Sequence, residues 1–425
     1  MPINLTITEN TVREMSFNSD PVEELYYGGD KVWPNRFAGE CIEFDSPEEN
    51  TITIKKADGF RLYACRNGYT WESAYDGRYT FGGDNGPIRF RGDISFVNTS
   101  SYNTYNDGSA IRFYQEETIA TGSPIKLSGV LLTLWYSNVT EDDSRLIFSR
   151  EMFSGLTDLD DASELLMPLG MFYQGSCSWM FANTNITKPP VLRAKRIEIE
   201  CYYSMFENCK KLKDMPELPG ESLGGACYAF MFAGCESLVN VKPLLANYAG
   251  GKCYMGMFSG CKSLEYPPEI AATKAGIQCC ALMFQGCSNL KEAPEFHFTY
   301  LASECFWRTF SACVSLKEAP ALPFKQMRDS CYDSMFEYCE ALESATIEAT
   351  SMAKDCMKGM FRGCKSLKRL EVSFAQWDMD EASQRYVTVG WVFGVPASGL
   401  FIKPASLSAV YDNDHIPTGW NAVNK

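Results

Sequence analysis

The sequence predicts a mixed α and β fold: an N-terminal all-β domain, then a solenoid of 26-residue repeats with a parallel strand ribbon and a helix layer. Three observations support this prediction. A Phe recurs every 26 residues, and once after 25; Cys and Leu stand at fixed distances from it; and alternating apolar and polar residues fill the preceding segment. Repeats of about 20–29 residues are typical of solenoids, because one unit buries its apolar face only by stacking on another.

Residues 1–36 are predicted to form a small N-terminal attachment segment. Leu5–Thr8 alternates like a strand, and Glu24–Trp33 has the pattern of a strand, a Gly-Gly turn and a second strand. The segment is too short to fold alone. We therefore expect it to pair with another chain, and we expect the protein to be a homo-oligomer.

Residues 37–145 are predicted to form a β-sandwich-like domain. Apolar and polar residues alternate in five short segments: Thr51–Ile54, Phe60–Tyr63, Ile88–Phe90, Ile94–Phe96 and Ile111–Tyr114. Turn pairs such as Asn85-Gly86 separate the segments at intervals near ten residues, as in β-sandwiches. The aromatic residues suit either the core or a carbohydrate-stacking surface: Tyr63, Tyr69, Trp71, Tyr75 and Tyr79.

The repeat array is predicted over residues 146–376, with degenerate repeats at its N-terminal end. Its Phe column consists of Phe206, Phe232, Phe258, Phe284, Phe310, Phe336 and Phe361. Cys stands five residues before and three after each Phe, usually with Met one before, a spacing that fits the inner face of a short helix. The Gly or Asn before the second Cys is expected to end the helix, and a Leu six residues after the Phe to begin a strand. Residues 377–425 are predicted to form a C-terminal cap, with a final helix and strand between Trp377 and Val395.

Fourteen of the 18 Cys stand in the two columns, seven in each. The column after the Phe is expected to be a structural ladder: Cys209, Cys235, Cys261, Cys287, Cys313, Cys339 and Cys364. Reduced, buried thiols are the favoured interpretation, because small apolar side chains suit a crowded layer. Disulfides and a metal are the alternatives, although the C-x7-C spacing with no His nearby suits zinc poorly.

Charge and hydropathy exclude some classes of function. Acidic residues outnumber basic ones by 53 to 39, a net charge of −14, so no nucleic-acid partner is expected. No apolar run approaches the roughly 18 residues needed to span a bilayer, so no membrane insertion is expected. Met1–Thr6 lacks the basic and then apolar pattern of a secretory signal.

No catalytic, cofactor-binding or metal-binding residue is predicted, and the protein is not expected to be an enzyme. His297 is placed in a loop without a nucleophile to serve. Four other motifs are expected to be turns or solvated faces: Gly82–Gly86, Arg91–Asp93, Asp158–Glu164 and Asp412–Asp414. The last two are alternative calcium sites, but neither has the Gly and closing Glu of an EF-hand loop. His415 follows the last of these clusters.

One column of the array varies while its core columns stay constant. The predicted partner-binding strand face lies eight residues after each Phe: Asp214, Asn240, Tyr266, Glu292, Glu318, Ser344 and Arg369. Variation on a fixed scaffold is how a solenoid face acquires specificity. The alternative is that exposed positions simply drift.

Over residues 201–372 the unit Cys-Tyr-x-x-x-Met-Phe-x-x-Cys-x-x-Leu resembles the BspA-like leucine-rich repeats of surface proteins from gut and oral bacteria. Ile125–Leu134 is similar to the segment that leads into such arrays in Bacteroides-type proteins. Gly399–Pro404 and Ile416–Trp420 are similar to their usual ending. The resemblance implies a leucine-rich-repeat solenoid that acts as an adhesin or binding protein; similar arrays occur in tail and fibre proteins of phages.

Secreted members of that family carry a signal peptide or a lipoprotein Cys, and the start of this sequence shows neither pattern, which favours the phage-encoded type. We therefore expect a virion structural or recognition protein on the phage tail or capsid exterior. It would bind a host cell-surface protein or glycan through the array, and other virion proteins through the N-terminal segment. The alternative is an extracellular bacterial adhesin whose signal peptide is absent. A carbohydrate-active enzyme would need a paired acid and base, which the sequence does not reveal.

Overall fold

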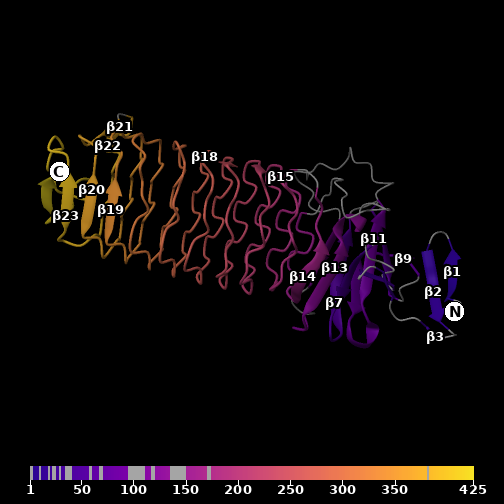
Figure 1. The fold of residues 1–425 in the computed structure, drawn as a ribbon. Helices are drawn as coiled ribbons and strands as arrows, with labels where there is room; N and C mark the ends of the chain where they lie inside the picture. The colour runs from indigo at the N-terminus through magenta and orange to yellow at the C-terminus, as the bar shows by residue number, and fades with distance from the viewer. Residues whose placement is uncertain are drawn as a thin grey trace.

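The structure is a computed structural model. It describes residues 3–8, 11–17, 20–21, 25–27, 30–33, 41–56, 60–66, 70–93, 111–115, 120–134, 150–169, 174–380 and 382–425. A row of stacked coils occupies the second half of the chain and follows a β domain (Figure 1). The aromatic residue Tyr69 and the expected strand Ile94–Phe96 lie outside the described residues.

The N-terminal segment contains two small antiparallel sheets. One has the order β1-β2-β3, and the other is the pair β4-β5. The five strands are β1 (Ile3–Thr8), β2 (Thr11–Phe17), β3 (Asp20–Pro21), β4 (Leu25–Tyr27) and β5 (Asp30–Trp33). The pairing of β4 with β5 gives the two strands expected over Glu24–Trp33, and the Gly-Gly pair expected between them lies outside the described residues.

The β domain consists of two sheets, ordered β14-β13-β6-β11-β8-β9 and β10-β7-β12. Neighbouring strands are antiparallel except for the parallel pair β13-β14. The strands are β6 (Ile42–Asp45), β7 (Asn50–Lys56), β8 (Arg61–Cys65), β9 (Glu72–Ser73), β10 (Gly77–Phe81), β11 (Ile88–Asp93), β12 (Ile111–Tyr114), β13 (Ile125–Val130) and β14 (Leu159–Leu166). Two short 3-10 helices accompany them, η1 (Gly83–Asn85) and η4 (Leu131–Leu134).

The two sheets share an aromatic core. Phe44 of β6 and Phe90 of β11 are fully buried. The Phe44 ring centroid lies 6.0 Å from that of Phe90 and 5.1 Å from that of Phe113. Phe113 belongs to β12 in the opposite sheet. Strand alternation therefore turns one face of each sheet toward the other, as in a sandwich.

A ladder of stacked Phe rings forms the core of the solenoid. Its members are Phe153, Phe181, Phe206, Phe232, Phe258, Phe284, Phe310, Phe336 and Phe361, with successive centroids 5.5–5.9 Å apart. The degenerate repeats thus belong to the stack. Phe113 of the β domain lies 5.7 Å from Phe153, and Trp391 lies 6.0 Å from Phe361. One hydrophobic core therefore runs from the β domain to the C-terminal cap.

The predicted helix layer is absent, and this part of the fold prediction is wrong. Strands account for 25% of the described structure and helical residues for 2%, with no α-helix. Segments such as 200–209 form overlapping β-turns instead. Every fourth residue has a positive φ: 59° at Glu200, 52° at Ser204 and 59° at Asn208. Left-handed residues at that interval cannot form an α-helix, which needs a negative φ throughout.

Backbone N–H groups in the turn segments alternate between two kinds of acceptor. The Met205 N–H donates to the Tyr202 carbonyl, three residues earlier, at 3.2 Å. The next N–H, of Phe206, donates instead to the Met231 carbonyl of the following coil at 2.9 Å. The same alternation recurs in the coils that follow. Buried amides are thus satisfied without a helix, partly within a turn and partly between coils.

The turn series also explains why the sequence looked helical. Cys201 and Tyr202 are buried side by side, and Met205 and Phe206 follow four residues later. A four-residue period is close to the 3.6 of an α-helix, so the apolar pattern of a short segment fits both. The Gly before the second Cys, such as Gly286 with a φ of 72°, is left-handed as expected of a helix end. It is one member of the turn series, however, and ends no helix.

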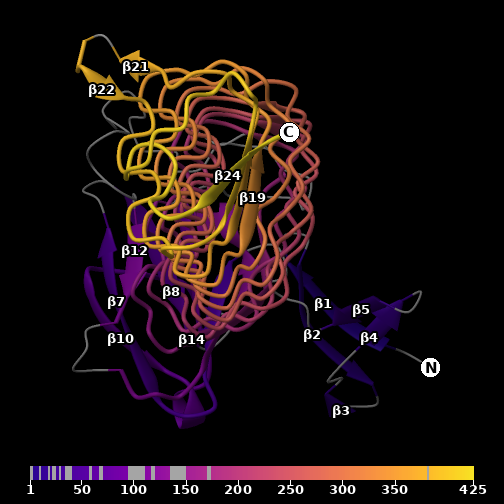
Figure 2. The same ribbon diagram turned by 90° about the vertical axis from the view of Figure 1, so that its left-hand side faces the viewer.

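The predicted parallel ribbon occurs only in short pieces, and these lie at different places of the repeat, so no single ribbon runs along the described solenoid. Two-stranded pairs β15-β16 and β17-β18 precede a four-stranded sheet of order β19-β20-β23-β24, all parallel. These strands are β15 (Arg196–Ile197), β16 (Ser222–Leu223), β17 (Tyr248–Ala249), β18 (Lys274–Ala275), β19 (Ser344–Ile347), β20 (Arg369–Val372), β23 (Leu400–Lys403) and β24 (Asn421–Asn424). Viewed along the stack, successive coils follow nearly the same outline (Figure 2).

The C-terminal cap contains one more turn coil where a final helix was expected. Gly390 and Gly394 have φ values of 62° and 78°, and the Phe361 N–H donates to the Trp391 carbonyl at 2.7 Å. Val392 thus occupies the Phe position and Trp391 the Met position before it, and the Trp391 ring covers the end of the ladder, with its centroid 6.0 Å from that of Phe361. An antiparallel pair, β21 (Met379–Asp380) and β22 (Arg385–Tyr386), precedes this coil.

Replacing Gly286 with Ala is expected to destabilise the solenoid by about 1–2 kcal/mol, because an L-residue is strained at a φ of 72°. An added Cβ would meet no atom closer than 3.9 Å, so backbone strain is the main change. Ala312→Gly, at the same position of the next coil with a φ of 62°, should have the opposite effect. Urea unfolding followed by tryptophan fluorescence measures both. Equal midpoints for the three proteins would contradict the left-handed conformation.

Candidate functional site

The predicted strand face forms a column along the solenoid, one residue per coil. Asp214 bridges to Asn240, whose side-chain amide donates to Asp214 Oδ1 at 2.7 Å. Glu318 bridges to Ser344, which pairs with Arg369 between β19 and β20. Asp214, Asn240 and Glu318 are exposed, whereas Ser344 and Arg369 are half-buried. The structure brings these pairs into register, but only Ser344 and Arg369 lie in strands. The other five positions of the column lie in isolated bridges or bends, so the strand predicted there is wrong.

Tyr266 and Glu292 occupy the middle of the same column. The residues before them are aligned by a backbone hydrogen bond of 3.0 Å from the Lys291 N–H to the Glu265 carbonyl. Lys291 Nζ also lies 2.6 Å from Glu265 and 5.7 Å from the Tyr266 ring centroid. The hydrogen bond with Glu265 raises the pKa of Lys291. Tyr266 is 53% exposed, and Glu292 is exposed without an ion pair among the described residues.

Many of the varied surface charges pair with a charge one coil away. Lys368 lies 2.7 Å from Glu343, and its hydrogen bond lowers the pKa of that carboxyl. Lys195 Nζ forms a similar ion pair with Glu221 Oε1, at 2.8 Å. Such pairs are satisfied within the protein, so part of the surface variation supports the register between coils. Glu292 and Glu318 are exposed members of the column without such an ion pair among the described residues, and Tyr266 is exposed beside Lys291.

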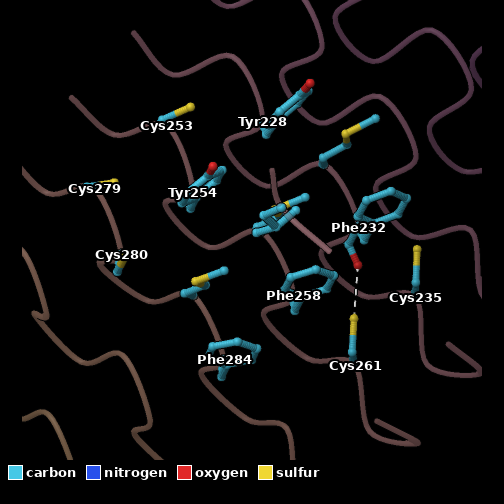
Figure 3. Packing of buried hydrophobic residues seen from close by; sticks show 14 of the residues in the cluster. Tyr228, Phe232, Cys235, Cys253, Tyr254, Phe258, Cys261, Cys279, Cys280 and Phe284 are labelled. Atoms are coloured by element: carbon cyan, nitrogen blue, oxygen red, sulfur yellow. Dashed lines mark hydrogen bonds between the residues drawn. The ribbon is translucent and has the colours of Figure 1, made fainter. Parts of the chain in front are cut away.

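The predicted Cys ladder lies inside the solenoid. Each of its seven thiols donates to the Phe carbonyl of the preceding coil at 3.0–3.2 Å, as Cys261 does to Phe232 (Figure 3). The Phe232 carbonyl also accepts the N–H of Cys235 at 3.1 Å. None of the 18 Cys forms a disulfide, and all are buried. The ladder is therefore a hydrogen-bonded part of the core.

The Asp158–Glu164 cluster begins with a carboxylate that the protein itself surrounds. Asp158 is 9% exposed, and its Oδ2 accepts the Thr121 and Gly122 N–H groups at 2.8 and 3.1 Å and the Gln115 amide at 3.1 Å. The Asp158 N–H donates back to Gln115 Oε1 at 2.8 Å. These bonds join the β domain to the first coil. The arrangement assigns Asp158 a structural role at this junction.

The Asp412–Asp414 cluster organises the C-terminal cap. Asp414 Oδ1 accepts the Gly390 N–H at 2.7 Å, and Asp412 Oδ1 accepts the Asp414 N–H at 2.8 Å. His415 is buried, with Nδ1 2.7 Å from Asp412 Oδ1, and its carbonyl accepts the Trp391 indole N–H at 2.7 Å. The cluster thus holds the last coil in place beneath the tail.

The other motifs also have structural surroundings. Gly83 N–H donates to the Ser46 carbonyl at 3.2 Å, so the Gly82–Gly86 turn packs against the β6–β7 connection. Gly92 lies in β11, where the Leu134 carbonyl leaves no room for a Cβ. His297 is exposed. Within the described part of the chain, no group of three or more potential ligands could hold a metal, and no helix could cross a membrane.

Sequence reasoning missed a groove of about 370 Å³ on the turn side of the first coils. Its lining includes three aromatic residues, Trp179, Tyr203 and Phe230. Trp179 and Phe230 stand immediately before an inward Met-Phe pair, and Tyr203 stands two residues before one. All three are at outward positions of the turn segments. Aromatic residues at successive outward positions were the available signal. The signal was weak, because Tyr203 stands three residues before its Phe and the other two stand two before theirs, so the three share no single column.

No known protein family matches the chain, and no curated protein is similar to it. The resemblance to BspA-like repeats therefore stays a prediction.

Native protein is expected to be inert to Ellman's reagent, because all 18 thiols are buried and the thiolate is the reactive form. Burial also raises the pKa of the seven Cys ladder thiols, to about 12 for Cys287. Roughly one such thiol in ten thousand is ionised at pH 8. Guanidinium should then release 18 reactive thiols per chain. Rapid reaction of several thiols in the native state would contradict the buried ladder.

The C-terminal cap is expected to weaken in acid. Burial acts to raise the pKa of Asp412, but hydrogen bonds with His415 and Asp414 outweigh it and hold that pKa below its usual value. A carboxyl with a depressed pKa stabilises the fold above its unfolded pKa, and this contribution disappears as the pH falls through the folded pKa. Asp412→Asn should therefore unfold at a lower temperature than wild type near pH 6, with a gap that shrinks below about pH 4. A gap independent of pH would refute this role.

Proposed function

We propose that the protein is a non-enzymatic structural and recognition protein of a phage virion. It is exposed on the tail or capsid exterior, and it binds a host cell-surface protein or glycan through the strand face of the solenoid. The observation that carries the proposal is the alignment of varied, mostly exposed residues at one-coil intervals on a uniform core. Such a surface changes its specificity without disturbing its fold.

The middle of the column is the best candidate for the contact. Tyr266 offers a large, half-exposed aromatic ring, and the neighbouring Glu292 offers a carboxylate. Tyr is among the residues that contribute most to binding energy at protein interfaces, because it buries a large area at little cost in conformational entropy. The cation of Lys291 beside the ring adds a donor at the same spot.

The N-terminal segment is proposed to bind other virion proteins and to take part in a homo-oligomer. Its sheets have only three and two strands, and small sheets of this kind are marginally stable alone. Their edge strands carry backbone groups suited to pairing with another chain.

A bacterial cell-surface adhesin is the second candidate, favoured by the resemblance of the repeat unit to surface proteins. Mass spectrometry of purified phage particles separates the two. Peptides of this chain in the particles support the virion assignment, and their presence only in the cell envelope of a bacterium supports the adhesin.

The host-recognition proposal predicts saturable retention of the purified full chain by gut bacterial cells. The double variant Tyr266→Ala, Glu292→Ala should raise the half-saturation concentration at least tenfold, because it removes the aromatic and the acidic contact together. Tyr300→Ala is the matched control: Tyr300 is 50% exposed but lies outside the column.

Equal retention of the double variant and the control would contradict recognition through the strand face. Absence of saturable retention by any candidate host would contradict host recognition and leave a spacer role for the solenoid.

A further inference from the structure

Two small, buried residues of one coil lie on the lining of the groove on the turn side of the first coils. These are Ala226 and Ala229, and the equivalent positions of the next coil hold Lys252 and Met255. The larger pair forms one end of the groove, and Arg150 belongs to the lining near its other end. The groove therefore ends at the coil that carries the larger pair.

Three aromatic side chains form steps along the groove. The ring centroids of Trp179 and Tyr203 are 4.8 Å apart, and those of Tyr203 and Phe230 are 5.8 Å apart. The Phe230 ring lies against Gly256, where a Cβ would collide with it. Gly256 thus lets the ring lie close to the backbone of the next coil. All three aromatic residues are partly exposed.

Charged groups of both signs accompany the rings. The Arg150 guanidinium lies 4.5 Å from the Trp179 centroid, and Lys252 is exposed. Glu200 lies between them on the lining, and its backbone carbonyl accepts the Ser178 hydroxyl at 2.6 Å. Burial and then the neighbouring carboxylates of Glu207 and Glu200 raise the pKa of Tyr203, so its hydroxyl stays protonated at neutral pH.

We propose that this groove binds a neutral oligosaccharide. The C–H face of a pyranose ring packs against the negatively charged face of an aromatic ring, and its hydroxyls can donate to Glu200 and accept from Arg150 and Lys252. A strongly charged ligand of either sign would meet a like charge here. A purely apolar ligand would bury these charged groups without compensation. The groove volume falls within the roughly 300–1,000 Å³ of small-molecule sites.

The groove is independent of the proposed strand-face function. It lies along the turn segments before and around the Phe ladder, whereas the strand-face column begins eight residues after each Phe. Variants of one surface leave the other intact, so either proposal can fail alone.

The test is a glycan array of neutral and acidic oligosaccharides of three to six sugars, probed with the labelled full chain and followed by titration calorimetry with the best neutral ligand. Phe230→Ala removes a step, and Ala226→Lys fills the groove with the residue that the next coil carries at the equivalent position and at a similar φ, 59° against 54°. Each should weaken binding at least tenfold. Trp307→Ala is the control, because Trp307 is also a partly exposed aromatic residue of a turn segment beside an Arg, Arg308, but lies outside the groove.

We expect the protein to bind neutral glycans, and we expect Phe230→Ala and Ala226→Lys to weaken this binding at least tenfold. The thermal unfolding of both variants should be unchanged. Retention of no glycan, or of acidic glycans alone, would overturn the proposal. It would also be overturned by neutral binding that Ala226→Lys leaves intact, because that result would place the ligand elsewhere on the chain.

Discussion

The whole solenoid depends on where its backbone N–H groups find acceptors. In a helix the N–H groups would be used within one segment, and adjacent coils would be held by side chains alone. Here alternate N–H groups reach the following coil, as from Phe206 to Met231, and so fix the distance between coils. That distance sets the 5.5–5.9 Å spacing of the Phe rings. It also brings the Cys261 thiol to the Phe232 carbonyl at 3.2 Å.

A fixed spacing has different consequences inside and outside. An inward column must hold side chains of one shape, because each packs on its equivalent in the next coil; this accounts for the constant Phe and Cys. An outward column has no such requirement. Its residues form ion pairs with a neighbouring coil, as Lys291 does with Glu265, or stay exposed to solvent, as about half of Tyr266 does. The lining of the groove includes the small residues Ala226 and Ala229, where the next coil carries Lys252 and Met255.

The two ends of the stack need different solutions, because a terminal coil has a neighbour on one side only. At the first coil, the Phe ladder continues into Phe113 of the β domain, and Asp158 fastens the junction through hydrogen bonds. At the last coil, Trp391 covers the final Phe, and Asp414 holds Gly390 in its turn. The polar clusters of the sequence are thus used where the repeat pattern stops.

The period, the inward columns and the place of the strand-face column could be predicted from the sequence, because burial selects the residue type at each repeat. Phe232 and Cys261 could be placed in the core from their spacing alone. The helix could not be distinguished from the turn series, since both bury residues about four apart. Only the tertiary structure decided between them, by supplying acceptors on the next coil for alternate N–H groups and so permitting left-handed residues such as Ser204. It likewise decided the groove, because Trp179, Tyr203 and Phe230 come from different coils and meet only when the coils stack in register.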